Sequence, residues 1–201
     1  MGNVTCGIGI SLDGYAAGPH QSLKHPMGDI PKNVLHRWMF EEDEDNKQKA
    51  EMLNYLVDAD AFIMGSNMFM PPDMHDDPDW KGWWDDNPPY HAPVFVLSKQ
   101  PRASIVMEGG TTFHFVTDGI ESAFKQAKEA AGDGKISIAG GANTVNQYLA
   151  AGLIDELWLH IAPVTIGSGA RLFEGVQNLK LEPVEVSGTK LATHIRYKVL
   201  K

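Results

Sequence analysis

The feature that most constrains the fold is the alternation of short strand-like stretches with helix-like ones. Apolar stretches of strand length, mostly rich in β-branched residues, occur at 4–12, 61–64, 94–97, 114–117, 135–139 and 156–162. Helical periodicity predicts helices over 33–57, 119–131 and about 143–151. Strands that alternate with helices are joined by right-handed crossovers, so the pattern predicts an α/β fold with a mostly parallel central sheet flanked by helices. The tail alternates over 179–186 and 191–199 around the turn Ser187–Lys190, which predicts a C-terminal antiparallel hairpin at one side.

Composition narrows the class of protein. The chain has 201 residues without an internal repeat or a clear linker, which favours one domain over 1–201. Its formal net charge of −9 disfavours a nucleic-acid surface, and the single cysteine, Cys6, excludes an internal disulfide framework. No stretch approaches the roughly 20 apolar residues of a membrane span, and the first residues do not resemble a secretory signal. We therefore expect a soluble, cytoplasmic protein that binds a small molecule, with no nucleic-acid or membrane partner.

The strongest local motif is Ile136–Thr144, in which Gly140 and Gly141 stand between a buried strand and the start of a helix. Free backbone N–H groups and the positive end of a helix dipole suit a phosphate or a diphosphate. Asn143 or Thr144 is a candidate cap for that helix. A plain tight turn from strand to helix explains the paired glycines equally well.

Small polar residues also follow two other predicted strands, as Gly65, Ser66 and Asn67 after one and Ser98 and Lys99 after the other. Each group alone is common after a strand. Because ligands of parallel sheets bind outside the carboxyl ends of the strands, the groups together predict one nucleotide groove. Lys99 contributes a single point charge to it.

The stretch 167–171 is a second glycine-rich loop, and it lacks the spacing of a nucleoside-triphosphate-binding motif. Its Arg171 faces the cleft or the outer surface, and we favour the cleft. The stretch 71–93 contains a group of acidic residues around His75 that resembles a metal site. Since the segment predicts no regular structure to fix ligands, we favour a solvated acidic loop and no metal.

Three tryptophans, Trp80, Trp83 and Trp84, lie beside this acidic stretch and are costly to leave in water, so we expect them to cover the core, a partner subunit or a flat substrate. His36, His114 and His160 lie within predicted regular elements and are interpreted as structural. No nucleophile motif is present, and Cys6 lies inside a strand, so covalent catalysis has no support.

Four pieces of the chain together resemble a known family: Ile10–Gly14, Ile138–Ala142, Ile154–Leu157 and Ala162–Phe173. In this order they are similar to the dihydrofolate reductase-like family, and most similar to the branch of the bacterial riboflavin-biosynthesis reductase, the RibD C-terminal domain. The resemblance implies a single-domain fold of that type and a homodimer. No deaminase zinc motif accompanies the reductase-like part, so the sequence does not resemble the two-domain riboflavin enzyme.

The resemblance also implies a cofactor, NADPH with NADH possible, lying across the strand ends. It assigns the pyrophosphate to Ala139, Gly140, Gly141, Ala142, Asn143 and Thr144, with a cis Gly140–Gly141 bond. The adenosine phosphate side falls to Gly65, Ser66, Asn67, Ser98 and Lys99. Asp13 and Gly14 begin the loop over the nicotinamide, and Gly169 to Arg171 lie near that ring.

Two departures from the family pattern bear on function. Ser66 and Asn67 stand where the family carries an arginine that grips the 2′-phosphate, so both cofactors stay open, with Lys99 as a compensating cation. Asn33 stands where folate-reducing members carry an acid, which argues against ordinary dihydrofolate reduction.

We therefore expect an NAD(P)H-dependent oxidoreductase that transfers a hydride to a small heterocyclic substrate, pterin- or pyrimidine-like. The substrate would contact Gly14 and Asn33 and stack near Trp83 and Trp84, with the loop 15–31 as its cover. Asp13 is the best-placed carboxylate for proton donation, and a bound water is equally suitable. Two alternatives stand: a non-catalytic nucleotide-binding or sensor protein on the same fold, and a structural dimer module anchored by the tryptophans.

Overall fold

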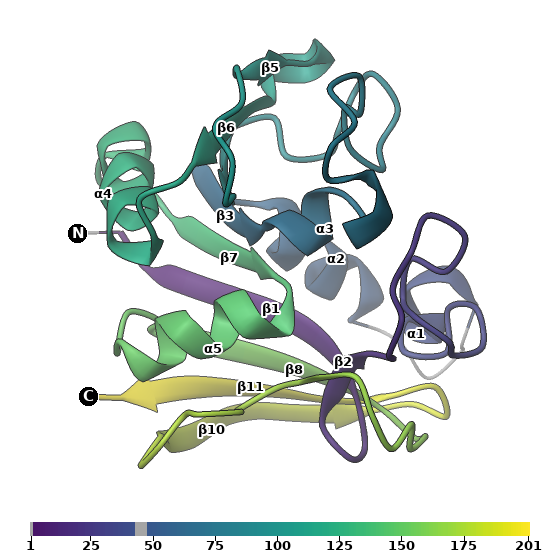
Figure 1. Cartoon of the computed structure of the whole chain (residues 1–201). Coiled ribbons are helices and arrows are strands. Elements are labelled where there is room, and N and C mark those ends of the chain that lie inside the picture. Colours follow the sequence, from purple (N-terminus) through teal and green to yellow (C-terminus); the bar gives the residue numbers. More distant parts are fainter. Residues whose placement is uncertain (1, 43–47) are drawn as a thin grey trace.

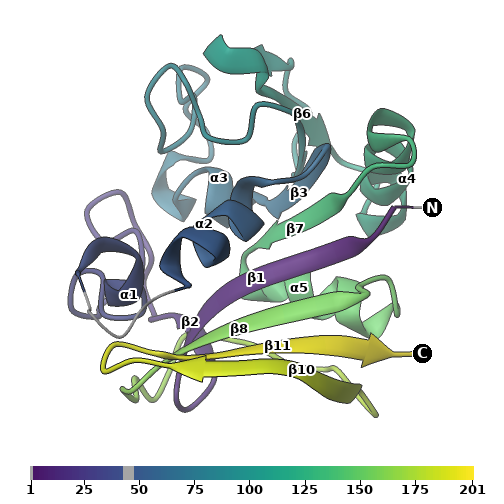
Figure 2. The same cartoon turned by 180° about the vertical axis from the view of Figure 1, so that it is seen from behind.

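The predicted strands lie in one nine-stranded sheet in the computed structural model, which describes residues 2–42 and 48–201 (Figures 1 and 2). Its strand order is β10-β11-β8-β1-β7-β3-β4-β6-β5. The strands are β1 (Val4–Ser11), β3 (Ala61–Gly65), β4 (Pro93–Leu97), β5 (Ile105–Val106), β6 (Thr112–Val116), β7 (Ile136–Gly140), β8 (Glu156–Ala162), β10 (Lys180–Gly188) and β11 (Thr193–Leu200). The six strands from β8 to β6 are parallel, which confirms the predicted fold class.

Antiparallel pairs close both sides of the sheet. β11 pairs with β8 and with β10, so the C-terminal hairpin lies where the sequence predicts it. At the opposite edge β5 pairs with β6, a two-residue strand too short for the sequence to reveal. A separate small sheet joins β2 (Tyr15–Ala17) to β9 (Ala170–Arg171), within segments predicted as loops.

Helices cover both faces of the sheet. α4 (Ile120–Ala131) and α5 (Ala142–Ala150) pack on one face, against the inward residues Val4, Cys6 and Ile8 of β1. α2 (Lys49–Val57) lies on the other face, as Figure 2 shows from behind. There Gly7 leaves room for Leu56 of α2, since a Cβ at Gly7 would lie 2.5 Å from the Leu56 side chain. Short helical turns complete the fold as α1 (Arg37–Phe40), α3 (Ser66–Phe69), η1 (Pro72–Met74) and η2 (Glu108–Gly110).

The prediction of one helix over 33–57 is wrong at its start. Asn33 has a φ of +58°, and α1 spans only four residues before Glu41 becomes extended. The second part, α2, begins at Lys49, and residues 43–47 lie outside the described residues. Apolar side chains of α1 and α2 lie in the same buried cluster, which is why their spacing predicted a single helix. Among the described helices, none has the length and apolar character needed to cross a membrane.

Candidate functional site

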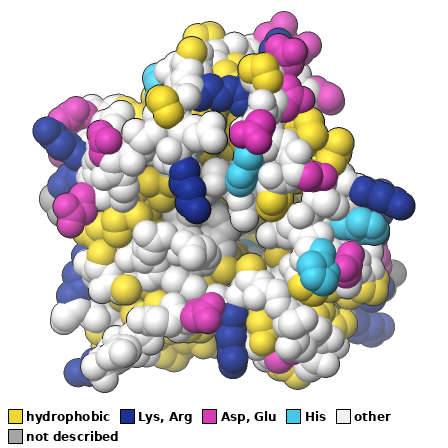
Figure 3. Space-filling view, in the orientation of Figure 1, with side chains coloured by type: hydrophobic (Ala, Val, Ile, Leu, Met, Phe, Trp, Pro, Cys, Tyr) yellow, Lys and Arg dark blue, Asp and Glu magenta, His cyan; other side chains and the backbone are white. Residues whose placement is uncertain are grey.

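The carboxyl ends of the central strands border a hollow in the molecular surface. Figure 3 shows it in the middle of the face viewed, and Figure 1 places the ends of β1 and β7 and the start of α5 around it. Because β7, β3 and β4 are consecutive in the sheet, the residues after each of them converge here, as predicted.

The start of α5 presents open backbone amides. Gly140 and Gly141 are joined by a cis peptide bond, as the resemblance implies. Gly141 is the N-cap of α5, no side chain caps this end, and the first turn contains no acidic residue. A Cβ at Gly141 would meet nothing within 4 Å. The first N–H groups of α5 therefore point into free space. They form the positive end of the helix dipole, an arrangement that fits the diphosphate of a dinucleotide.

The side chains of the two predicted capping residues, Asn143 and Thr144, make other contacts. The Asn143 Oδ1 accepts a hydrogen bond from Gln147 Nε2 at 2.6 Å, so this side chain turns along the helix. Thr144 is buried and packs against Gly65, where a Cβ would lie 2.5 Å from the Thr144 Oγ1. The prediction that either one caps α5 is wrong. The Thr144 side chain instead joins the end of β3 to the start of α5.

The residues after β3 and β4 lie at neighbouring strand ends, since Gly65 pairs with Leu97 in register. Gly65 caps α3, which contains Ser66 and Asn67. The Ser98 hydroxyl donates to the Gln100 carbonyl at 2.8 Å and holds a turn. Lys99, the next residue, is exposed. The charge of Lys99 is thus available to a ligand, whereas the Ser98 hydroxyl is engaged.

Asp13 connects the end of β1 to the loop 163–168 through hydrogen bonds. Its carboxylate accepts hydrogen bonds from the Ser11 hydroxyl at 2.5 Å and from the N–H groups of Ile166 and Gly167. The Ser11 hydrogen bond, with these two backbone N–H groups, lowers the pKa of Asp13. A carboxylate held in its ionised form has no proton to give at neutral pH. These hydrogen bonds disfavour Asp13 as the proton donor, a role that stays a prediction, and they hold the loop 163–168 on the end of β1.

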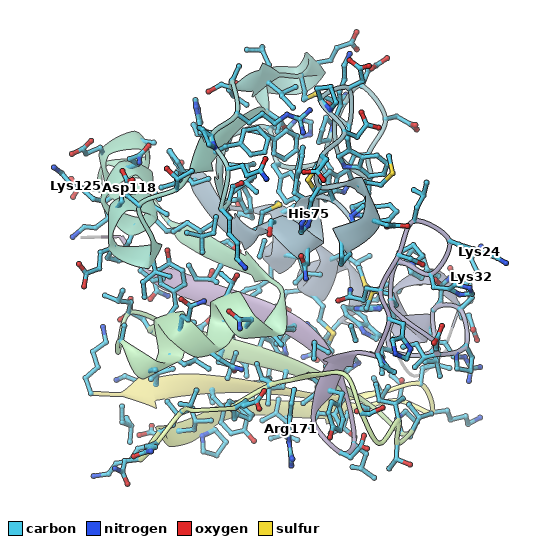
Figure 4. All side chains as sticks on the ribbon, viewed as in Figure 1. Lys24, Lys32, His75, Asp118, Lys125 and Arg171 are labelled. Atoms are coloured by element: carbon cyan, nitrogen blue, oxygen red, sulfur yellow. The ribbon has the colours of Figure 1, made fainter. Side chains whose placement is uncertain are left out.

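Gly14, Gly169 and Arg171 lie around these hydrogen bonds of Asp13. The Gly14 carbonyl accepts the N–H of Leu172 at 2.8 Å, which ties β9 to the turn after β1. Gly169 has a φ of +128° and packs so closely on the Ala17 carbonyl that a side chain has no room. The Arg171 guanidinium lies 5.6 Å from the centre of the Tyr15 ring, and Figure 4 shows the side chain pointing away from the hollow. The prediction that Arg171 faces the cleft is wrong, because the β2–β9 pairing turns it outward.

The tryptophans cover an apolar cluster. Trp80 donates its indole N–H to the Phe69 carbonyl at 2.9 Å, and Trp83 packs edge-on against Trp80. The Trp84 ring stacks on Phe113 at 5.7 Å and contacts Tyr90 edge-on. Of the three interpretations, covering the core is the one that these contacts support. The half-buried Trp84 has one ring face on Phe113, and substrate stacking on Trp83 or Trp84 stays a prediction.

Two residues of the acidic stretch bear on the site, Asp73 through a hydrogen bond and His75 through its position. Asp73 in η1 accepts the N–H of Leu23 at 3.0 and 3.2 Å, which ties the loop 15–31 to η1. Figure 4 shows His75, the next residue after η1, in front of α3 at the rim of the hollow. No three His, Cys, Asp or Glu side chains within 2–42 and 48–201 are arranged to hold a metal ion. Sequence analysis considered His75 only as a metal ligand within a solvated acidic loop and did not name it as a substrate contact.

Asn146 is a residue that sequence analysis missed. It is buried on α5, donates from Nδ2 to the Arg171 carbonyl at 2.9 Å and accepts the Phe173 N–H at 2.7 Å. The two hydrogen bonds attach β9 to the helix that begins at Gly141. The only signal in the sequence is an asparagine beside Val145, on the apolar face of the helix.

Comparison with known proteins identifies the family. The sequence model of the RibD C-terminal domain matches residues 3–194, nearly the whole chain. The chain belongs to the RibD C-terminal domain family. The predicted resemblance is thereby confirmed, and membership supports a reductase.

Solved structures of RibD-type proteins share the fold. A putative riboflavin biosynthesis protein from Shewanella sp. PV-4 is 24% identical, with a TM-score of 0.66 and all of both chains covered. A pyrimidine reductase-like protein from Corynebacterium diphtheriae is 17% identical, with a TM-score of 0.59, over 100% of this chain and 92% of that one. A curated relative, the uncharacterized protein YwjB of Bacillus subtilis, is 32% identical over 83 residues. These residues are 40% of this chain and 47% of YwjB, so the match spans less than half of that relative.

Proposed function

We propose that this RibD C-terminal domain protein is an NAD(P)H-dependent reductase of a small pyrimidine-like heterocycle. The observation that carries the proposal is the uncapped start of α5, where Gly141 borders free space and no side chain of the described residues caps the helix. Family membership supports the reductase chemistry, and the similarity to a pyrimidine reductase-like protein supports the substrate class.

Residues of three strand ends would hold the dinucleotide. Ala139 to Thr144 would carry its diphosphate through backbone N–H groups, and Gly65 to Asn67 with Lys99 would lie beside its adenosine half. A bound reduced nicotinamide supplies the hydride, and the chain supplies position and exclusion of water. Asn33 as an amide argues against ordinary dihydrofolate reduction.

On the substrate side we propose His75 as a direct contact. Its imidazole stands at the rim of the hollow, and the loop that carries it is held on both sides, by Asp73 on Leu23 and by Trp80 on Phe69. The Asp13 carboxylate, by contrast, already accepts hydrogen bonds from the Ser11 hydroxyl and the Gly167 N–H. A proton for the reduced substrate would come from water or from His75.

Calorimetric titration with NADPH and NADH tests the dinucleotide site. We expect saturable binding, and we expect Gly141→Val to weaken it at least 10-fold at an unchanged melting temperature, since the added side chain enters free space. Lys125→Ala, on the remote α4, is the matched surface control. Absence of binding of either dinucleotide at millimolar concentration would refute the proposal.

Choice of cofactor is tested at Lys99. Because Ser66 and Asn67 replace the family's arginine, we propose that Lys99 is the cation that meets the 2′-phosphate of NADPH. Lys99→Ala should raise the Kd of NADPH several-fold and leave that of NADH unchanged. An equal change for both cofactors would contradict this role.

A non-catalytic nucleotide-binding protein is the second candidate, favoured by Asn33 and by the engagement of Asp13. A panel of pyrimidines, pterins and flavins mixed with the protein and NADPH separates the two. Binding of NADPH without oxidation by any compound supports the second candidate.

We also propose a homodimer, through the exposed edge strand β10. Val184 and Val186 are 54% and 64% exposed there. Near the start of the same strand lies an apolar pocket of about 350 Å³ lined by Phe173, Val176, Leu179 and Leu181, together with Asn178. Sedimentation velocity should show a dimer for the wild type and a monomer for Val186→Glu.

A further inference from the structure

A buried cluster of aromatic nitrogen groups lies on the face of the sheet that α1 and α2 cover. It comprises Trp38 of α1, His160 of β8 and His194 of β11, each 1% exposed. The Nδ1 atoms of His160 and His194 are 2.9 Å apart. Since one hydrogen lies between two such nitrogens, one imidazole donates it and the other accepts it. The pair thus forms its hydrogen bond with both rings neutral.

Trp38 closes this cluster from the helix side. Its ring lies 4.2 Å from that of His160 at an angle of 32°, and 5.1 Å from that of His194, edge-on. Its indole nitrogen and the Nε2 atoms of both histidines are buried with no hydrogen-bond partner among the described residues. Ring contact with the imidazoles, together with packing on Met52, Trp158 and Ala192, therefore holds the Trp38 side chain in place.

A third histidine faces the same cluster. A Cβ at Gly9 of β1 would lie 2.9 Å from the Nε2 of His36, and Gly9 pairs in register with His160. Burial lowers the pKa of His36, and burial together with the charges of His194 and His36 lowers that of His160. Burial lowers the pKa of His194 to about 4. All three imidazoles are neutral at pH 7.

The other charged and titratable groups near the cluster contact Trp158 or lie at the surface. Arg196 of β11 stacks on Trp158 and pairs with Glu185 of β10, and Tyr55 of α2 contacts Trp158 edge-on. Arg37 and Glu41 of α1 pair with each other at the exposed surface. Tyr55 also interacts with Glu156 of β8. Within 2–42 and 48–201, no carboxylate is hydrogen-bonded or ion-paired to His160 or His194.

This cluster anchors the segment that borders the hollow. α1 has four residues and no side-chain cap, so its own hydrogen bonds do not hold it in place. The chain before it runs from Gly18 through Leu23, tethered to Asp73, to Asn33 and His36. Figure 1 shows this segment and α1 together near the end of β1, one of the strands whose ends border the hollow of Figure 3.

We propose that Trp38 and the His160–His194 pair are a positioning element that docks α1 and the segment 18–36 against the sheet, and that protonation of the pair releases them. The proposal rests on the proposed function in one respect, namely that this segment forms the substrate side of the hollow. Docking itself is independent of any ligand.

Hydrogen exchange of the ligand-free protein at pH 7.5 and pH 5 tests the docking. His194 alone, titrating at about 4 when docked and about 6.5 when exposed, makes release roughly 30-fold more favourable at pH 5. We expect peptides of 18–41 to lose about 10- to 30-fold of their protection, corrected for intrinsic exchange, while β6 keeps its protection. In His194→Gln, whose amide does not titrate, the loss should be clearly smaller, because only His160 and His36 then remain to gain a proton on release.

His114→Gln, on β6, is the matched control and should keep the wild-type pH dependence. If His194→Gln does not fold, Trp38→Ala gives the answer, since it should leave 18–41 unprotected at both pH values. An undiminished loss of protection in His194→Gln, or none in the wild type, would overturn the proposal. Dinucleotide titration at both pH values distinguishes this outcome from failure of the proposed function, because the α5 site lies on the opposite face and its affinity should not follow the docking.

Discussion

The contact between Gly65 and Thr144 gives the sharpest test of how the site is assembled. Gly65 has a φ of −79° and a ψ of 156°, a backbone that alanine adopts without strain. The cost of Gly65→Ala is therefore steric alone. Its Cβ would stand 2.5 Å from the Thr144 Oγ1, about 0.9 Å inside ordinary van der Waals contact.

The magnitude follows from that overlap. Overpacking of this size costs about 1–3 kcal/mol, and the smaller entropy of the unfolded alanine chain offsets about 0.4–1 kcal/mol of it. We expect Gly65→Ala to be less stable by about 1–2 kcal/mol. At roughly 2–4 °C per kcal/mol for a domain of this size, the melting temperature should fall by about 2–8 °C.

A double-mutant cycle, measured by urea denaturation, checks the mechanism. Thr144→Ala removes the clashing atom, so adding it to Gly65→Ala should recover at least half of the lost stability. Thr144→Val keeps an atom in the place of the Oγ1 and should recover none. Strictly additive effects of Gly65→Ala and Thr144→Ala would refute the reasoning, since they would show that the two residues do not touch.

Three further predictions follow from buried or engaged polar groups. The free energy of unfolding should fall by about 2 kcal/mol between pH 7.5 and pH 5, because His194, with a folded pKa of about 4, gains a proton on unfolding below about pH 6.5. Urea titrations at each pH measure this, and a flat profile would contradict neutral burial. Asn146→Ala should cost about 2 kcal/mol in the same assay, because it leaves the Arg171 carbonyl and the Phe173 N–H without partners; a loss below about 0.5 kcal/mol would mean that water replaces the amide. Asp13→Asn should speed amide exchange of Ile166 and Gly167 several-fold, since an amide cannot accept all the hydrogen bonds of the carboxylate; unchanged exchange there would disprove this role of Asp13.

Local pattern was sufficient to predict the central strands and the strand-to-helix turn at Gly140 and Gly141. Five central strands are mostly buried apolar runs: β1, β3, β4, β7 and β8. The length and burial of such a strand can be predicted from its own residues, without knowledge of the rest of the chain. Gly140 and Gly141 interrupt one run at the point where a helix must start, which is equally local. The convergence of Gly65 and Lys99 on that point follows from parallel pairing alone.

What side chains do at the site was decided by contacts between segments distant in sequence. Asp13 is engaged by amides 153 and 154 residues away, and Arg171 is turned outward by its pairing with Tyr15. The His160–His194 pair joins β8 to β11 across 34 residues. Periodicity records which face of an element is apolar, but not which partner meets a polar group there. The sequence by itself therefore determined the layers and the place of the groove, whereas only the tertiary structure decided which polar groups are bound by the protein and which are left for a ligand.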